Sequence, residues 1–130
     1  MNEKKTIFVV DDDAIFRKVI GRQLEQAGFS VQSFENGQGM AEHMRRSRPV
    51  ATIIDMVMPD KDGMETLLDL LDTEHRGKVI AVSGTRQYLD YAEGMHIDAT
   101  LLKPVTPEAL MKTLAGLGVV PAQAGERPPS

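Results

Sequence analysis

Residues 8–16 read FVVDDDAIF, and this stretch holds the transition that decides the fold. An apolar run of β-branched and aromatic residues is followed at once by three aspartates, Asp11, Asp12 and Asp13. Residues 14–27 then show helical spacing, and Gly28 is suited to end that helix. The residues expected on its buried side are Ile15, Phe16, Val19, Ile20, Leu24 and Ala27. A buried strand leading into an amphipathic helix predicts a β-α unit with acids at its junction.

The same unit recurs along the chain. Apolar runs typical of strands occupy residues 6–10, 30–34, 50–54, 78–82 and 99–102. The second run alternates in polarity, which is typical of an edge strand. Helical spacing follows the later runs at Met40, Ala41 and Met44, at Met64, Leu67, Leu68 and Leu71, at Tyr88, Leu89, Ala92 and Met95, and at Leu110, Leu114 and Leu117. Strands that alternate with helices predict an α/β fold, a doubly wound (βα)5 domain around a five-stranded parallel sheet.

Length and composition set the limits of the domain and its surroundings. The chain has 130 residues, 42% hydrophobic and 26% charged, which is ordinary for one globular domain. We expect that domain over residues 1–117, where Thr106 and Pro107 begin the last helix, and a tail or the start of a linker over residues 118–130.

The charge and the cysteine content exclude several classes of function. There is no cysteine, and the histidines are scattered, so disulfides, thiolate sites and zinc sites are not expected. The net charge of −4 argues against direct binding to nucleic acid or to an anionic membrane. No stretch approaches the ~18 apolar residues of a membrane span, so the cytoplasm is the expected location.

Polar residues gather where the predicted strands end, and ligands of open α/β sheets bind at that edge. The strand ends supply Asp11, Asp12, Asp13, Asp55, Ser83 with Gly84, and Lys103 with Pro104. Two carboxylates about 4 Å apart repel by about 4 kcal/mol at an effective dielectric of 20. Several carboxylates at the same end of the sheet therefore favour the binding of a cation. Hard oxygen ligands favour Mg²⁺, with Mn²⁺ and Ca²⁺ as alternatives. Helix capping, at Asp13 or a neighbour, explains one acid but not the others.

This set of residues resembles the receiver domain of two-component response regulators over residues 5–117. The motifs that carry the resemblance are the acids of VVDDD, Asp55 in IIDMVMPDKDG, Ser83 in VIAVSG, and Lys103-Pro104 in LLKP. The resemblance implies a flavodoxin-like strand order of 2-1-3-4-5. It also implies that Lys103-Pro104 matches a cis peptide bond of the family.

The resemblance also implies a role for each residue. Asp55 matches the phosphoacceptor, which receives its phosphoryl group from a histidine kinase or histidine phosphotransfer protein. Asp12 matches the direct ligand of Mg²⁺, Asp11 the acid acting through water, and Val57 the ligand through its carbonyl oxygen. Ser83 and Lys103 match the hydroxyl and the cation that pair with the phosphoryl oxygens. The N–H groups of Met56 and Gly84, which follow Asp55 and Ser83, are expected to bind the phosphoryl group as well.

The expected output is a conformational switch. The phosphoryl group would draw Ser83 and the following loop inward, biasing the fourth helix and fifth strand toward an unknown protein partner. The sequence departs from the family at Thr100, where the family usually has Tyr or Phe. Tyr88 and Tyr91 offer another aromatic surface, and Val57 and Thr85 flank the expected path of hydrolytic water.

Three alternatives remain open from the sequence. DDDAI fits the D-x-D pattern of haloacid-dehalogenase-type phosphatases, but only Glu108 and Glu126 follow Lys103 as acids. A flavodoxin-like cofactor binder would need a phosphate-cradling first loop, where three aspartates repel phosphate. A receiver used only for docking would keep the same residues without being phosphorylated. The sequence also fits either a stand-alone regulator or a fragment of a longer one.

Overall fold

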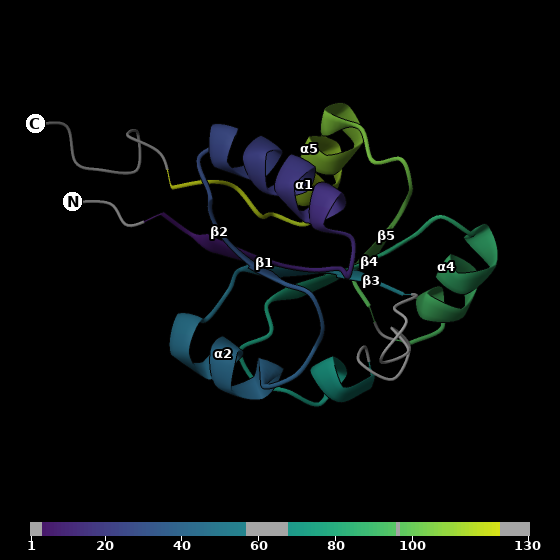
Figure 1. The fold of residues 1–130 in the computed structure, drawn as a ribbon, viewed down its shortest axis with the longest axis horizontal. Coiled ribbons are helices and arrows are strands. Elements are labelled where there is room, and N and C mark those ends of the chain that lie inside the picture. Colours follow the sequence, from purple (N-terminus) through teal and green to yellow (C-terminus); the bar gives the residue numbers. More distant parts are fainter. Residues whose placement is uncertain (1–3, 57–67, 96, 123–130) are drawn as a thin grey trace, which may run out of the picture.

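The computed structural model describes residues 4–56, 68–95 and 97–122, and its centre is a parallel five-stranded sheet (Figure 1). The strands are β1 (Thr6–Val10), β2 (Ser30–Phe34), β3 (Ala51–Asp55), β4 (Lys78–Ser83) and β5 (Ala99–Leu102). They lie in the order β2-β1-β3-β4-β5, and every neighbouring pair is parallel. The predicted fold class and strand order are therefore confirmed. The third and fourth strands extend one residue beyond the predicted ends, so Asp55 and Ser83 are themselves strand residues.

Helices follow the strands as predicted. They are α1 (Ala14–Gln26), α2 (Met40–Ser47), α4 (Arg86–Glu93) and α5 (Pro107–Gly116), and residues 68–71 are also helical. Met64 and Leu67 of the predicted third helix lie outside the described residues. Within the described ranges, no helix has the length and apolar character needed to cross a membrane.

The two faces of the sheet bury separate sets of side chains. Alternate residues of β1 supply both: Ile7 and Val9 point to one face, Phe8 and Val10 to the other. The first set packs with Ile20 and Leu24 of α1 and with Leu110 and Leu114 of α5, and Figure 1 shows these helices together on one side. The second set packs with Met40 and Met44 of α2 and Ala92 of α4. The sheet is thus covered on both faces, which leaves its edges and strand ends for function.

Helix α1 departs from the prediction in part. Ile20 and Leu24 are buried, as expected, but Ile15 is 75% exposed and Val19 is 47% exposed. The buried stripe runs through Ile20, Gly21 and Leu24, and successive helical residues are separated by about 100° around the axis. Ile15 and Val19 therefore lie beside this stripe rather than on it, and the predicted six-residue buried side is too wide.

The predicted N-terminal starts of the first and last helices agree with the structure. The Asp13 carboxylate caps α1 by accepting hydrogen bonds from the N–H groups of Ile15 and Phe16. Thr106 caps α5 by accepting from the N–H of Ala109. The packed chain continues past the expected boundary at residue 117, because Val119 is buried in the α1/α5 face of the core.

Candidate functional site

The backbone of the sheet places the predicted site residues. The N–H of Asp11 donates to the carbonyl of Phe34 (3.0 Å), which extends the β1–β2 pairing by one residue. Between β4 and β5, the N–H of Lys103 donates to the carbonyl of Ser83 (2.8 Å), which extends that pairing in the same way. Asp55 is the last residue of the central strand β3 and pairs with Val82. These residues, far apart in sequence, therefore reach one edge on rigid elements.

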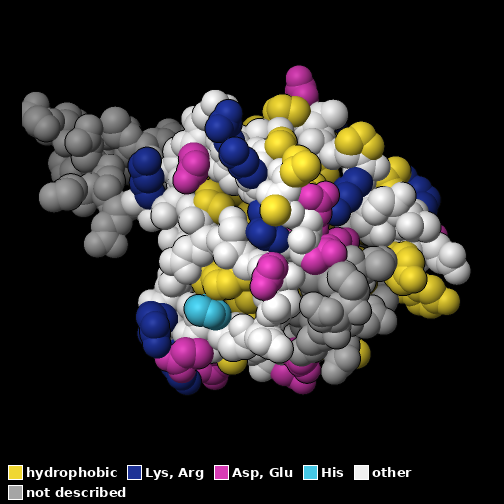
Figure 2. Space-filling model, viewed as in Figure 1, with side chains coloured by type: hydrophobic (Ala, Val, Ile, Leu, Met, Phe, Trp, Pro, Cys, Tyr) yellow, Lys and Arg dark blue, Asp and Glu magenta, His cyan; other side chains and the backbone are white. Residues whose placement is uncertain are grey.

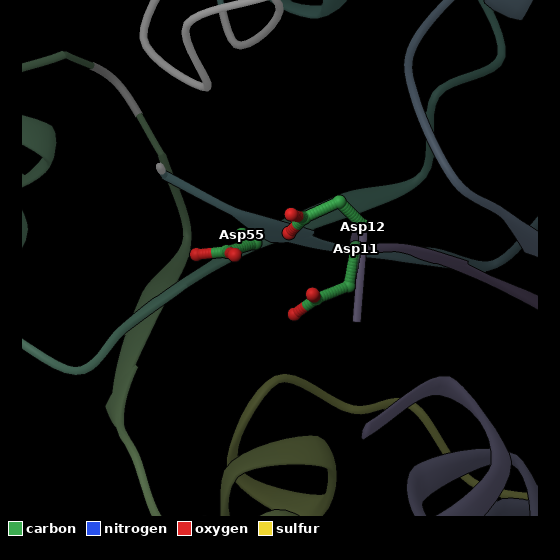
Figure 3. Close-up of side chains that lie close together, drawn as sticks. All are labelled: Asp11, Asp12 and Asp55. Atoms are coloured by element: carbon green, nitrogen blue, oxygen red, sulfur yellow. The ribbon is translucent and has the colours of Figure 1, made fainter. Parts of the chain in front are cut away.

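Three carboxylates meet at that edge. One oxygen from each of Asp11, Asp12 and Asp55 lies within 4.8 Å of the other two, and Figure 3 shows the side chains turned toward a common space. Asp11 is fully buried, Asp55 is 6% exposed, and Asp12 is exposed. Two unit charges at that separation repel by about 3.5 kcal/mol at an effective dielectric of 20, so the group favours a cation.

Lys103 supplies part of the positive charge. Its ammonium Nζ donates to Asp11 Oδ2 (2.9 Å) and lies 3.5 Å from Asp55 Oδ2. Burial alone lowers the pKa of Lys103, but the hydrogen bond to Asp11 and the charges of Asp55 and Asp11 outweigh it, so the pKa is raised. Because the pKa of Lys103 is raised on folding, its charged form contributes stability that is fully present below lysine's ordinary pKa. That contribution is lost as pH rises through the folded-state pKa. Lys103 is therefore charged throughout the neutral range.

The remaining charge fits a hard divalent cation. One lysine offsets part of the charge of three aspartates, and the atoms available as metal ligands are carboxylate oxygens. Mg²⁺ prefers one or two carboxylates and keeps several waters, and exposed Asp12 leaves the group open to solvent. On the face of the molecule drawn in Figure 2, acidic and basic side chains lie beside one another. The residues thus fit Mg²⁺, while Val57, the predicted carbonyl ligand, lies outside the described residues.

The two predicted backbone donors are placed differently. The N–H of Met56 donates to the carbonyl of Val82 (2.9 Å), so in this structure it belongs to the β3–β4 ladder and is not directed into the pocket. Binding of the phosphoryl group by the Met56 N–H stays a prediction, and it would require this bond to the Val82 carbonyl to open. Gly84 lies at the exposed end of β4, where an added Cβ would meet nothing within 4 Å. That open space would let a ligand oxygen approach the backbone of Gly84.

Ser83 lies at the centre of the same edge. Its strand, β4, runs between the strand of Asp55 and the strand that leads to Lys103. The side chain is buried, and its hydroxyl oxygen accepts a hydrogen bond from the N–H of Thr85 (3.0 Å). Ser83 therefore already holds the start of the loop that leads into α4.

The surface of α4 and β5 carries the departure at Thr100. The Thr100 hydroxyl donates to Glu93 Oε2 of α4 (3.4 Å), so a polar contact joins the strand to the helix. Tyr88 is 37% exposed and Tyr91 is 62% exposed. The two tyrosines predicted to offer a surface do lie at the surface of the molecule.

Two residues near the site were not found by sequence reasoning. Arg17 Nη1 donates to the carbonyl of Asp11 (2.6 Å), and the ring of Phe16 lies under Lys103, with 4.3 Å between Nζ and the ring centroid. Both stand on the first turns of α1, and nothing in a linear pattern pairs them with strand ends. The helical spacing of Phe16 predicts only a position in the core.

Residues 7–115 match the family described as response regulator receiver domain, and the chain belongs to that family. This class of protein has a phosphoacceptor role in two-component signalling. The strand order and the family match together favour it over the phosphatase alternative.

Individual relatives agree with this family. The chain is 29% identical over 111–113 residues to proteins that include the response regulator MprA of Mycobacterium leprae, covering 85% of this chain and 50% of MprA. It thus spans about half the length of the curated relatives it matches.

Solved structures agree on the fold. A CheY-like receiver domain from Methylobacillus flagellatus superposes with a TM-score of 0.77 at 24% identity, covering 87% of this chain and 98% of that one. TrrA of Thermotoga maritima, solved in complex with Mg²⁺-BeF, gives a TM-score of 0.77 at 22% identity, with 87% and 98% covered.

Proposed function

We propose that Asp55 accepts a phosphoryl group from a histidine kinase or histidine phosphotransfer protein and later loses it to water. The observation that carries the proposal is the position of the Asp55 carboxylate, which lies 3.5 Å from the Lys103 ammonium and inside the acidic group. An acceptor at the end of the central strand has a cationic partner, Lys103, already in place. Such preorganised charge is the main source of catalysis in phosphoryl transfer.

The environment of Asp11 supports Asp55 as the acceptor. Asp11 is fully buried, and both of its oxygens accept hydrogen bonds, from the N–H of Asp13 and from Lys103. A carboxylate held on both oxygens is a poor nucleophile but a good support for a lysine or a metal's water shell. This arrangement also argues against the phosphatase alternative, which would use the acid at the end of the first strand.

The residues that would hold Mg²⁺ are Asp12 and Asp55 directly and Asp11 through water, with the Val57 carbonyl as the remaining predicted protein ligand. When bound, Mg²⁺ would offset the negative charge that gathers on the phosphoryl oxygens. The fit rests on the three converging carboxylates and their excess negative charge.

The chain's own groups then carry the transfer. An Asp55 oxygen forms a bond to phosphorus while the bond from phosphorus to the donor's imidazole nitrogen breaks, giving an acyl phosphate. Lys103 pairs with one phosphoryl oxygen, and the Gly84 N–H and Ser83 hydroxyl can donate to another. Attack of water on phosphorus would return the Asp55 carboxylate. The domain would thus accelerate only its own phosphorylation and dephosphorylation.

The downstream effect would pass through β4 and α4. If the Ser83 hydroxyl turns to the phosphoryl group, its hydrogen bond from the Thr85 N–H must change. The loop after β4 would then adjust, and α4 with it. We propose that a protein partner in the cytoplasm reads this change and that the domain itself contacts no nucleic acid, in line with its net charge of −4. Of the residues 118–130 expected to form a tail or the start of a linker, those after Val119 would serve that role, since the Val119 side chain is buried in the core.

The proposal is tested by intact mass. The protein is incubated with Mg²⁺ and acetyl phosphate and measured promptly, with Asp55→Ala and the exposed-acid control Asp90→Ala in parallel. We expect one added phosphoryl group in the parent and in Asp90→Ala, dependent on Mg²⁺, and none in Asp55→Ala. Equal labelling of Asp55→Ala would exclude Asp55 as the acceptor. No labelling of the parent by acetyl phosphate or by any of a panel of histidine kinases would favour the docking alternative.

A further inference from the structure

The contact between Phe16 and Lys103 lies beside the acceptor and has no part in the function proposed so far. The Lys103 ammonium stands 4.3 Å from the centroid of the Phe16 ring, which is within the range of a cation–π interaction. Phe16 is fixed from two directions: its N–H donates to the Asp13 cap, and its side chain packs against the α1/α5 face of the core. The ring is therefore a rigid partner for a flexible side chain.

The ring completes the surroundings of the ammonium. Lys103 donates to Asp11 and lies close to Asp55, so two carboxylates flank its Nζ. The third partner is the Phe16 face, and the lysine side chain is only 24% exposed. A lysine has a flexible four-carbon stem and binds water strongly, so an ammonium without such a partner would tend to turn outward.

Space for that outward movement exists. A groove of about 420 Å³ runs between α1 and the segment after β5, and both Phe16 and Lys103 line it, together with Ile15, Val19, Pro104 and Val105. A smaller aliphatic side chain at position 16 would widen this groove beneath the ammonium. It would also remove the negative ring face that attracts the charge.

We propose that Phe16 is a positioning residue, which holds the Lys103 ammonium toward Asp55 by a cation–π contact. The inference rests on the function proposed for Asp55 and adds a specific source of preorganisation to it. Because Lys103 must meet the phosphoryl oxygens as charge develops, weakening the ring face slows phosphorylation without changing the shape of the core.

The test varies the electrostatics of the ring at nearly constant shape. Mono-, di- and trifluorophenylalanine are introduced singly at position 16, and the rate of phosphorylation by acetyl phosphate with Mg²⁺ is measured by intact mass. We expect the rate to fall stepwise with each fluorine, reaching about a threefold to tenfold loss with trifluorophenylalanine. Phe16→Leu should show a similar loss, and Phe16→Trp should retain the parent rate.

Phe29 offers a matched control, because it is 1% exposed within the core. The same fluorinated residues there should leave the rate unchanged. A flat series at position 16, with the parent still labelled on Asp55, overturns the positioning role and leaves the proposed function intact. A parent that gains no phosphoryl group overturns the proposed function, and the positioning role with it.

Discussion

Three adjacent aspartates occupy three different environments. Asp11 is buried and holds Lys103, Asp12 is exposed at the rim of the acidic group, and Asp13 caps α1. The sequence predicted a cap at Asp13 or a neighbour and a metal group from the others. It did not predict how deeply Asp11 is buried, because that depends on tertiary contacts such as those from Lys103, after β5, and from Arg17 of α1.

Asp12 is predicted to make Mg²⁺ stabilise the fold. In the parent, Mg²⁺ at 100 times its dissociation constant should raise the free energy of unfolding by about 2.7 kcal/mol. Asp12→Asn should lose most of this gain, yet be more stable than the parent in EDTA because one repulsive charge is gone. Thermal unfolding with and without Mg²⁺ measures both effects. An Asp12→Asn variant that still gains the parent's full increment would remove Asp12 from the ligands, and Asp90→Asn is the matched control.

Asp13 is predicted to matter for the helix and not for the metal. Asp13→Ala removes the acceptor for two backbone N–H groups and should lower the free energy of unfolding by about 1 kcal/mol. Asp13→Ser should recover most of that loss, since serine also caps helices well. Urea unfolding gives the stabilities, and a Mg²⁺ titration should give the parent's affinity in both variants. A large loss of Mg²⁺ affinity in Asp13→Ser would show that the cap assignment is incomplete.

At the scale of elements, the segment from β4 to α4 connects the site to the surface. Ser83 is buried at the strand end, its hydroxyl accepts from Thr85, and α4 is joined to β5 by the contact between Glu93 and Thr100. A change at Ser83 therefore has a physical route to α4. The sequence predicted coupling from Ser83 toward the fourth helix. It did not predict the contact between Thr100 and Glu93, because that contact depends on how α4 packs beside β5.

Ser83→Ala is predicted to uncouple α4 from the site. With Mg²⁺ and beryllofluoride, the parent should show amide chemical-shift changes across residues 84–93. In Ser83→Ala those changes should shrink to the immediate surroundings of Asp55, because no hydroxyl turns toward the ligand. Ser33→Ala, on the exposed part of β2, is the control and should behave as the parent does. Full α4 changes in Ser83→Ala would mean that the signal takes another path.

Gly77 is predicted to be essential where β4 begins beside β3. Its φ is +69°, and an added Cβ would lie 2.5 Å from the Pro49 carbonyl oxygen. Gly77→Ala should therefore cost about 1–2 kcal/mol from the backbone conformation alone, and more from the clash. Gly116→Ala, where an added Cβ meets nothing within 4 Å, should be neutral or slightly stabilising. Urea unfolding compares them, and equal stabilities would contradict the strain assigned to Gly77.

At the scale of the whole molecule, the sequence predicted what periodicity and strand ends determine. Alternating β-α patterns gave the five strands, and the rule that ligands bind at strand ends gathered Asp11, Asp55, Ser83 and Lys103. It missed features that depend on which helix residue faces which strand end. The contact of the Phe16 ring with Lys103 and the exposure of Ile15 are of this kind.

The most direct test of Asp55 as the phosphoacceptor is to locate the phosphoryl group. After reaction with acetyl phosphate and Mg²⁺, borohydride reduces an aspartyl phosphate to homoserine, and peptide mass spectrometry identifies the converted position. We expect homoserine at position 55 and unchanged aspartates at positions 11 and 12. Homoserine at position 11 or 12 in place of 55 would rule out Asp55 as the acceptor, because the acceptor would then be one of the acids assigned to hold the metal.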